Sequence, residues 1–244
     1  MSERAVTSPL ENRHARIYSQ SAWDYDALIA AEDCDHNLRN ALTELVGQSD
    51  CGTLVDVGTG TGRIVRWLAP HMERVVGLDR SPEMLRVAAR TSGAAVSPAV
   101  SLVVSDALTL PVASGVATMA VAAWVFGHFC EWWAGDWVWR VERAIGEMRR
   151  TTKPGGKMLI IESLGTCVDR PDPPTPSLRQ YHSLLTERYG FERRVVSTDY
   201  RFPDVTAASR MLGFFFGDAI ADEIRRRGSG RVPEWTGLWV ATVS

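Results

Sequence analysis

A short apolar run that ends in glycines constrains this chain more than any other feature. Residues 54–57, Leu-Val-Asp-Val, have the composition of a buried strand, and Gly58, Gly60 and Gly62 follow at alternate positions. Glycine lets the chain turn tightly and lets its backbone lie against a ligand. A helical pattern begins directly after the turn, at Arg63. The segment therefore predicts a strand, a ligand-contacting turn and a helix.

Strands and helices alternate along the rest of the chain. Apolar runs predict strands at 53–57, 75–78, 101–104, 116–123, 157–161, 191–202 and 234–243, and helical spacing occupies 13–46, 63–72, 84–90, 131–152, 178–189 and 205–227. Ser81 and Pro82 are typical of a helix start, and the proline-rich residues 169–177 predict a surface connection. This alternation favours an α/β fold whose mostly parallel sheet is covered on both faces.

The charge and composition of the chain argue against several classes of binding partner. The formal charge is −2, which provides no global basic field for nucleic acid, so none is expected as a partner. The four cysteines have no metal-binding spacing, and no metal is expected. The chain shows neither a signal peptide nor a run of apolar residues long enough to span a membrane, so the expected location is the cytoplasm.

Two residues refine the nature of the ligand. Arg63 stands where a dinucleotide-binding fingerprint has glycine or alanine, and its bulk disfavours a nicotinamide-dependent dehydrogenase. Asp79 follows the second strand, where a carboxylate can accept hydrogen bonds from both ribose hydroxyls of an adenosine. A helix-capping or surface role for Asp79 stays open on this evidence alone.

Five segments occur in an order typical of one protein family. They are residues 55–62, 75–85, 105–111, 122–126 and 153–160. Across residues 50–165 the chain therefore resembles class I S-adenosylmethionine-dependent methyltransferases. The resemblance implies a Rossmann-like methyltransferase fold with seven strands in the order 3-2-1-4-5-7-6, the last antiparallel, and an N-terminal helical cap.

The resemblance also implies a single domain, 1–244, with three parts. Residues 1–48 would form an N-terminal tail, to about residue 12, and the helical cap, and 49–165 the cofactor-binding core. Residues 166–244 would form a C-terminal half on the substrate side, with a helical insertion at 205–228. That insertion replaces a short hairpin of the family and is a candidate lid or dimer face.

S-adenosylmethionine is the implied cofactor, and S-adenosylhomocysteine its product. By resemblance, Asp56 and the glycine turn would contact the methionine part, Asp79 the ribose, and Met84 one face of the adenine. The complete set of expected cofactor residues is Asp56, Gly58, Thr59, Gly60, Gly62, Asp79, Arg80, Met84, Asp106, Ala107, Ala123, Trp124, Tyr18 and Tyr25. Tyr18 and Tyr25 belong to a stretch that resembles the cap of quinone-biosynthesis methyltransferases, where they either close over the sulfonium or only pack the cap.

Methyl transfer requires a base only when the acceptor must lose a proton. His128 follows the fourth strand, where the family places residues that face the substrate, and imidazole titrates near neutral pH. Glu162, at the end of the fifth strand, is the second candidate. A structural histidine and a surface carboxylate are the competing interpretations.

The sequence favours a small-molecule acceptor, because the motifs typical of nucleic-acid methyltransferases are missing. The accepting atom, O, N, S or C, is not specified. A protein or RNA methyltransferase remains an alternative, which an arginine patch at 225–227 beside the pocket would favour. A non-catalytic adenosyl-binding regulator is another alternative. The expected assembly is a monomer or a homodimer.

Overall fold

A seven-stranded sheet organises the computed structural model, which describes residues 9–47, 51–92 and 99–244. The strand order is β3-β2-β1-β4-β5-β9-β6, and only β9 runs antiparallel to its neighbours. The strands are β1 Thr53–Val57, β2 Arg74–Asp79, β3 Ala99–Val104, β4 Ala117–Ala123, β5 Thr152–Thr166, β6 Glu192–Ser197 and β9 Glu234–Thr242. Apart from two short extra strands that shift the numbering, this is the predicted topology.

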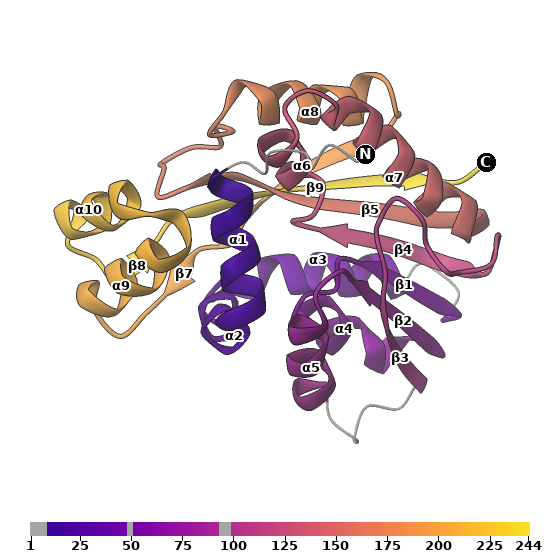
Figure 1. The fold of residues 1–244 in the computed structure, drawn as a ribbon, viewed down its shortest axis with the longest axis horizontal. Coiled ribbons are helices and arrows are strands. Elements are labelled where there is room, and N and C mark those ends of the chain that lie inside the picture. Colours follow the sequence, from indigo (N-terminus) through magenta and orange to yellow (C-terminus); the bar gives the residue numbers. More distant parts are fainter. Residues whose placement is uncertain (1–8, 48–50, 93–98) are drawn as a thin grey trace, which may run out of the picture.

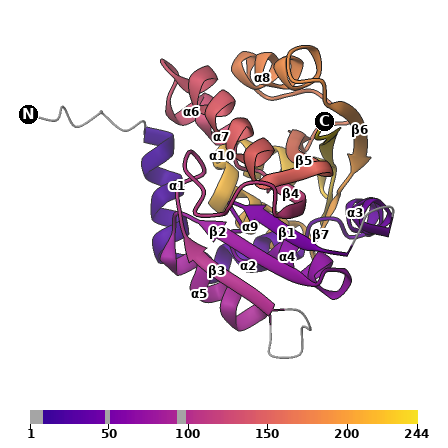
Figure 2. The same cartoon turned by 90° about the vertical axis from the view of Figure 1, so that its right-hand side faces the viewer.

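Helices cover both faces of this sheet, as the apolar strands require. They are α1 Pro9–Gln20, α2 Ala22–Ala30, α3 Asn37–Gly47, α4 Arg63–Leu68, α5 Pro82–Thr91, α6 Gly127–Trp132, α7 Trp137–Thr151 and α8 Pro176–Glu187, with the 3-10 turn η1 Ala69–His71 after α4. In Figure 2, α6, α7 and α8 lie on one side of the sheet, and α3, α4 and α5 lie on the other.

Consecutive residues of a strand pack into two different hydrophobic cores, one on each face of the sheet. Val55 packs in the core beneath α7 and α8, whereas its neighbour Leu54 packs in the core beneath α3 and α4. The same alternation places Ile160 in the first core and Ile161 in the second. Because strand side chains alternate between faces, a fully apolar strand stabilises both layers at once.

The predicted N-terminal tail is partly wrong. Residues 1–8 lie outside the described part of the chain, but α1 already begins at Pro9. Proline at a first helical position costs no hydrogen bond, because the N–H groups there have no partner within the helix. The helical cap predicted for 13–46 consists of three helices, α1, α2 and α3.

Two predicted helices are each divided. Residues 131–152 hold the end of α6 and all of α7, with a break at 133–136, and the predicted end of the helix at Lys153-Pro-Gly-Gly already belongs to β5. Residues 205–227 form α9 Val205–Phe216 and α10 Asp218–Arg227, which are separated by Gly217 at a φ of 99°. A residue with that φ cannot continue a right-handed helix.

The predicted strand 191–202 is divided as well. Its second part is β7 Tyr200–Arg201, which pairs with β8 Arg231–Val232 in a small separate sheet. Helices α9 and α10 lie between these two strands in sequence and form a lobe with them (Figure 1). Helix α9 contacts α2, so the helical insertion faces the N-terminal cap.

The glycine turn leads to a stability prediction. Gly58 has a φ of 69°, and a Cβ there would lie 2.3 Å from Cγ2 of Val125. Gly228 has nearly the same φ, 68°, but no atom within 4 Å of such a Cβ. We expect Gly58→Ala to lower the free energy of unfolding by about 3 kcal/mol and Gly228→Ala by about 1 kcal/mol in urea titrations. Equal losses would contradict the steric account.

Candidate active site

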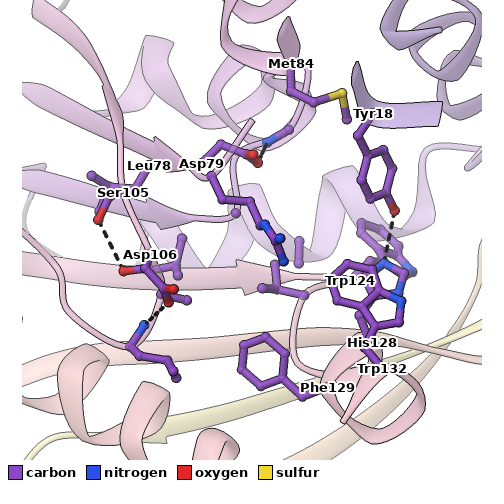
Figure 3. Close-up of a pocket in the computed structure, with 18 of the residues that line it drawn as sticks. Tyr18, Leu78, Asp79, Met84, Ser105, Asp106, Trp124, His128, Phe129 and Trp132 are labelled. Carbon is purple, nitrogen blue, oxygen red and sulfur yellow. Dashed lines mark hydrogen bonds between the residues drawn. The ribbon is translucent and has the colours of Figure 1, made fainter. Parts of the chain in front are cut away.

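A pocket of about 110 Å³ lies at the carboxyl ends of β1, β2 and β4, where a parallel sheet of this kind binds its ligands. Figure 3 shows Ser105 and Asp106 on one side of it and Tyr18, His128 and Trp132 on the other. The expected cofactor residues that line it are Tyr18, Tyr25, Gly58, Gly60, Asp79, Arg80, Met84, Asp106, Ala107, Ala123 and Trp124. We call it the cofactor pocket.

Asp79 is fixed at the end of β2 by the backbone around it. Its two carboxylate oxygens accept hydrogen bonds from the N–H groups of Gly60 and Ser81, each at 2.8 Å. Burial raises the pKa of Asp79, and those two backbone donors oppose the shift. The carboxylate thus ties the glycine turn to the start of α5, with the oxygens beside the pocket.

The other expected cofactor residues, Asp56, Thr59 and Gly62, do not line the pocket. Asp56 is buried behind the turn, where one oxygen accepts the Thr59 hydroxyl and the other, Oδ1, has no hydrogen-bond partner in the described chain. Burial raises the pKa of Asp56 to about 7. Gly62 precedes α4 and packs against Ala88. These residues shape the turn from behind.

A second pocket, of about 370 Å³, adjoins the cofactor pocket, and we call it the acceptor pocket. Tyr25, Trp124 and His128 line both. The acceptor pocket extends from this junction to Phe215 on α9 and to Glu234 on β9. The helical insertion therefore contributes to a pocket wall.

Aromatic side chains from three parts of the chain meet at the junction. Tyr18 Oη lies 3.1 Å from Nε2 of His128, whose ring stacks on Trp132 with centroids 4.5 Å apart. Phe215 of α9 lies 5.4 Å from Tyr25, centroid to centroid. The tyrosines of the cap thus face the pocket, and they also pack against each other.

Arg63 is a site residue that the sequence-based interpretation missed. Its guanidinium is buried, pairs with Glu32 at 2.5 Å and lies 3.9 Å from the centre of the Trp124 ring. Trp124 itself has a φ of 56°, a strained backbone conformation for a tryptophan. The sequence signal for this role is a charged residue on the apolar side of a short helix. The sequence alone indicates only that Arg63 disfavours a dinucleotide ligand.

The two candidate bases differ in their titration. Burial lowers the pKa of His128 to about 3, so the imidazole is neutral and weakly basic at neutral pH. Glu162 is buried at the edge of the acceptor pocket, where one oxygen accepts hydrogen bonds from Gly127 N–H and Tyr181 Oη. Burial raises the pKa of Glu162 to about 8. The ionised form of Glu162 is therefore a stronger base than the His128 imidazole, and at neutral pH most of the Glu162 carboxyl group is protonated.

This pKa predicts how stability depends on pH. Because folding raises the pKa of Glu162 from an ordinary value of 4.5 to about 8, the folded chain holds a proton that the unfolded chain has lost. We therefore expect the free energy of unfolding to fall as pH rises through this window. Glu162→Gln should flatten the fall in urea titrations, whereas Glu83→Gln at an exposed site should not. An unchanged slope in Glu162→Gln would contradict the shift.

The described ranges contain neither a cluster of metal-binding side chains nor a helix that could span a membrane. Residues 9–47, 51–92 and 99–244 contain no group of three or more histidine, cysteine, aspartate or glutamate side chains placed to hold a metal ion. Among the helices of these same ranges, none is long and apolar enough to cross a membrane.

Part of the chain is similar to known proteins. Residues 55–160 match the model of a methyltransferase domain. Demethylmenaquinone methyltransferase of Thermus thermophilus is 30% identical over 151 residues, which are 60% of this chain and 64% of that protein. The enzyme of the same name from Thermobifida fusca is 32% identical over 150 residues, 61% of this chain and 60% of its own length. The chain thus spans less than two thirds of these relatives.

A solved structure shares the fold. Phosphoethanolamine N-methyltransferase 2 of Haemonchus contortus, solved in complex with S-adenosyl-L-methionine, is 15% identical, with a TM-score of 0.59 over 99% of this chain and 61% of that one. The strand order and the glycine turn at the carboxyl ends of the strands are consistent with the methyltransferase domain that residues 55–160 match. Residues 55–160 are therefore similar to a methyltransferase domain, and the chain shares the fold of a solved methyltransferase.

Proposed function

We propose that the protein transfers a methyl group from S-adenosylmethionine to a small molecule held in the acceptor pocket. One observation carries the proposal: residues from the N-terminal cap and from the ends of several strands, each expected to contact the cofactor, line a single pocket. That pocket adjoins a second, larger one across Tyr25, Trp124 and His128. Two adjoining pockets suit a reaction between two bound small molecules.

The residues present fit the cofactor. Asp79 directs a buried carboxylate toward the pocket, where it can accept hydrogen bonds from ribose hydroxyls. A Cβ at Gly60 would have Met84 Cε at 3.6 Å as its nearest neighbour, so the absence of a side chain there leaves room for a ligand against the backbone. Asp106 and Met84 would hold the adenine edge and one adenine face.

When bound, S-adenosylmethionine supplies an already activated methyl group, so the protein's task is alignment and exclusion of water. Tyr18, Tyr25 and Phe215 close the junction from the cap and from the insertion. Trp124 and His128 form the rest of the wall between the pockets. Glu162, at the edge of the acceptor pocket, can take a proton from an acceptor that must lose one.

The ion pairs and the position of the arginine run 225–227 favour a small-molecule acceptor over a protein or RNA substrate. Arg225, Arg226 and Arg227 each form an ion pair with a carboxylate of α10, and none lines either pocket. The arginine run 225–227 is therefore not part of the pocket lining that would have favoured a macromolecule. The two relatives from Thermus thermophilus and Thermobifida fusca are also named for a small molecule, demethylmenaquinone.

Calorimetry tests the proposal first. Purified protein is titrated with S-adenosylmethionine and S-adenosylhomocysteine, and then incubated with methyl-labelled cofactor and a panel of phenols, amines, thiols and acids. Cofactor binding followed by label transfer to one of these supports the proposal. Failure to bind either cofactor form overturns it, and binding without transfer to any acceptor favours the non-catalytic regulator.

A further inference from the structure

The acceptor pocket has an unusual balance of charge. Carboxyl groups from four separate elements line it, and the one guanidinium among its lining residues, Arg63, is already paired with one of them. These carboxyl groups belong to Glu32, Glu131, Glu162 and Glu234. The remaining basic side chains of the lining are the imidazoles of His14 and His128. Burial lowers the pKa of His14 to about 4 and that of His128 to about 3, so both are uncharged at neutral pH.

Two of these carboxyl groups carry an oxygen without a partner. Glu32 Oε1 and Glu234 Oε2 are buried and have no hydrogen-bond partner among the described residues, and the two residues as a whole are 6% and 1% exposed. The other oxygens are held, Glu32 Oε2 by Arg63 and Glu234 Oε1 by the Ser163 hydroxyl at 2.6 Å. A buried polar oxygen with no donor is costly, and a donor on a bound ligand would remove that cost.

The remaining wall is aromatic and aliphatic. Tyr25, Trp124, Tyr200 and Phe215 line the acceptor pocket together with Leu28. Aromatic faces attract cations and also exclude water from an apolar ligand body. A volume of about 370 Å³ suits a compact organic molecule.

We propose that the acceptor pocket selects molecules that carry a basic nitrogen on an aromatic or apolar body, and that this nitrogen is the atom methylated. The inference rests on the proposed function and deepens it. An ammonium group supplies the hydrogen-bond donors and the positive charge that the carboxyl groups lack. A carboxylate or phosphate group on the ligand would instead find no free guanidinium among the lining residues to bind it.

Glu162 is the proton acceptor in this scheme. The bound ammonium gives one proton to the Glu162 carboxylate, and the freed nitrogen lone pair forms the bond to the methyl carbon. The carbon–sulfur bond breaks, and its electron pair goes to sulfur, which loses its positive charge. The methylated nitrogen then carries the positive charge that sulfur lost, and the proton on Glu162 leaves to solvent.

Amine binding should be coupled to proton release. Burial raises the pKa of Glu162 to about 8, so this group holds a proton in the free pocket at neutral pH, and burial also raises the pKa of Glu234. The charged or titratable groups that face Glu162 are Glu131, Cys130 and Tyr181, and those that face Glu234 are Glu32, Arg63 and Tyr200. An added cation lowers the carboxyl pKa, so the carboxyl group ionises as the amine binds.

The test compares ligands of one shape and different charge. Benzylamine, phenethylamine and tryptamine, each with the alcohol and the carboxylate of the same skeleton, are titrated into protein saturated with S-adenosylhomocysteine. Titration at pH 7 in buffers of different ionisation enthalpy counts the protons released. We expect amines to bind about tenfold or more tightly than the alcohols, as a charge-assisted hydrogen bond implies, and to release protons that alcohols do not.

The variants identify the group responsible. Glu162→Gln should lose the proton release and most of the preference for amines, and the exposed Glu83→Gln should keep both. Glu234→Gln makes the same comparison if Glu162→Gln does not fold. Alcohols or carboxylates that bind as tightly as amines overturn the inference, as does the failure of every amine to bind at millimolar concentration to protein that binds S-adenosylhomocysteine. Failure of S-adenosylhomocysteine itself to bind overturns the proposed function.

Discussion

Asp79→Ala is expected to weaken the binding of S-adenosylmethionine and S-adenosylhomocysteine by about ten- to a hundredfold, because each hydrogen bond to a charged group contributes about 1.5–3 kcal/mol. The carboxylate oxygens are oriented by the N–H groups of Gly60 and Ser81, so the acceptor geometry exists before a ligand arrives. An oriented acceptor binds without a cost of reorganisation. Calorimetry with both cofactor forms measures the loss.

The same carboxylate also holds the turn, so the two roles must be separated. Asp79→Asn keeps the shape and an acceptor oxygen, and we expect it to bind more weakly than the wild type but more tightly than the alanine variant. Asp222→Ala, at an exposed ion pair on α10, is the control and should bind normally. Wild-type affinity in a folded Asp79→Ala protein would remove Asp79 from the cofactor site.

Arg63→Met is expected to lower the free energy of unfolding by about 3–5 kcal/mol, the range measured when one partner of a buried ion pair is removed. The side chains of Arg63 and Glu32 are only 8% and 3% exposed. Without the guanidinium, the Glu32 carboxylate must stay buried and unpaired or take up a proton. Urea titration of the purified variant measures the change.

Removing both charges should restore most of the loss. In Arg63→Met combined with Glu32→Met no charge remains buried, and apolar replacements of buried ion pairs are often neutral or stabilising. Arg86→Met, which breaks the exposed pair with Glu83, is expected to change stability by less than about 0.5 kcal/mol. A small loss in Arg63→Met, similar to that of Arg86→Met, would show that the buried pair is not a stability determinant.

Local features of the sequence predicted the core of the fold well. The strand 53–57 and its glycine turn occur as expected, because an apolar run followed by residues that permit a positive φ has few alternative conformations. Ser81 caps α5 with its hydroxyl, which accepts from Met84 N–H. Both signals act over a few residues, so no distant contact is needed to interpret them.

The predicted ends of helices and strands are wrong where tertiary contacts override the local preference of the sequence. The sequence predicts that the helix runs to Thr152 and that the next strand begins only at Lys157, yet the structure places residues 152–156 in β5, where Thr152 pairs with Ala117 of β4. Pairing with a neighbouring strand supplies hydrogen bonds that the isolated segment lacks. The break between α6 and α7 is similar, since the apolar spacing persists across a turn that lets α6 pack on α8 and α7 pack on β4 and β5.

The glycine turn and the grouping of most expected cofactor residues around one pocket follow from the sequence motifs, because parallel strands place their carboxyl-end loops side by side and each loop carries its own motif. The strand order follows from the resemblance to class I methyltransferases. The acceptor pocket follows from neither. Glu32, Arg63, Glu162 and Glu234 lie in segments far apart in the chain, and no spacing relates them. Only the packing of the cap and of the insertion on the sheet brings these side chains around one cavity, so the character of the acceptor is set by tertiary structure.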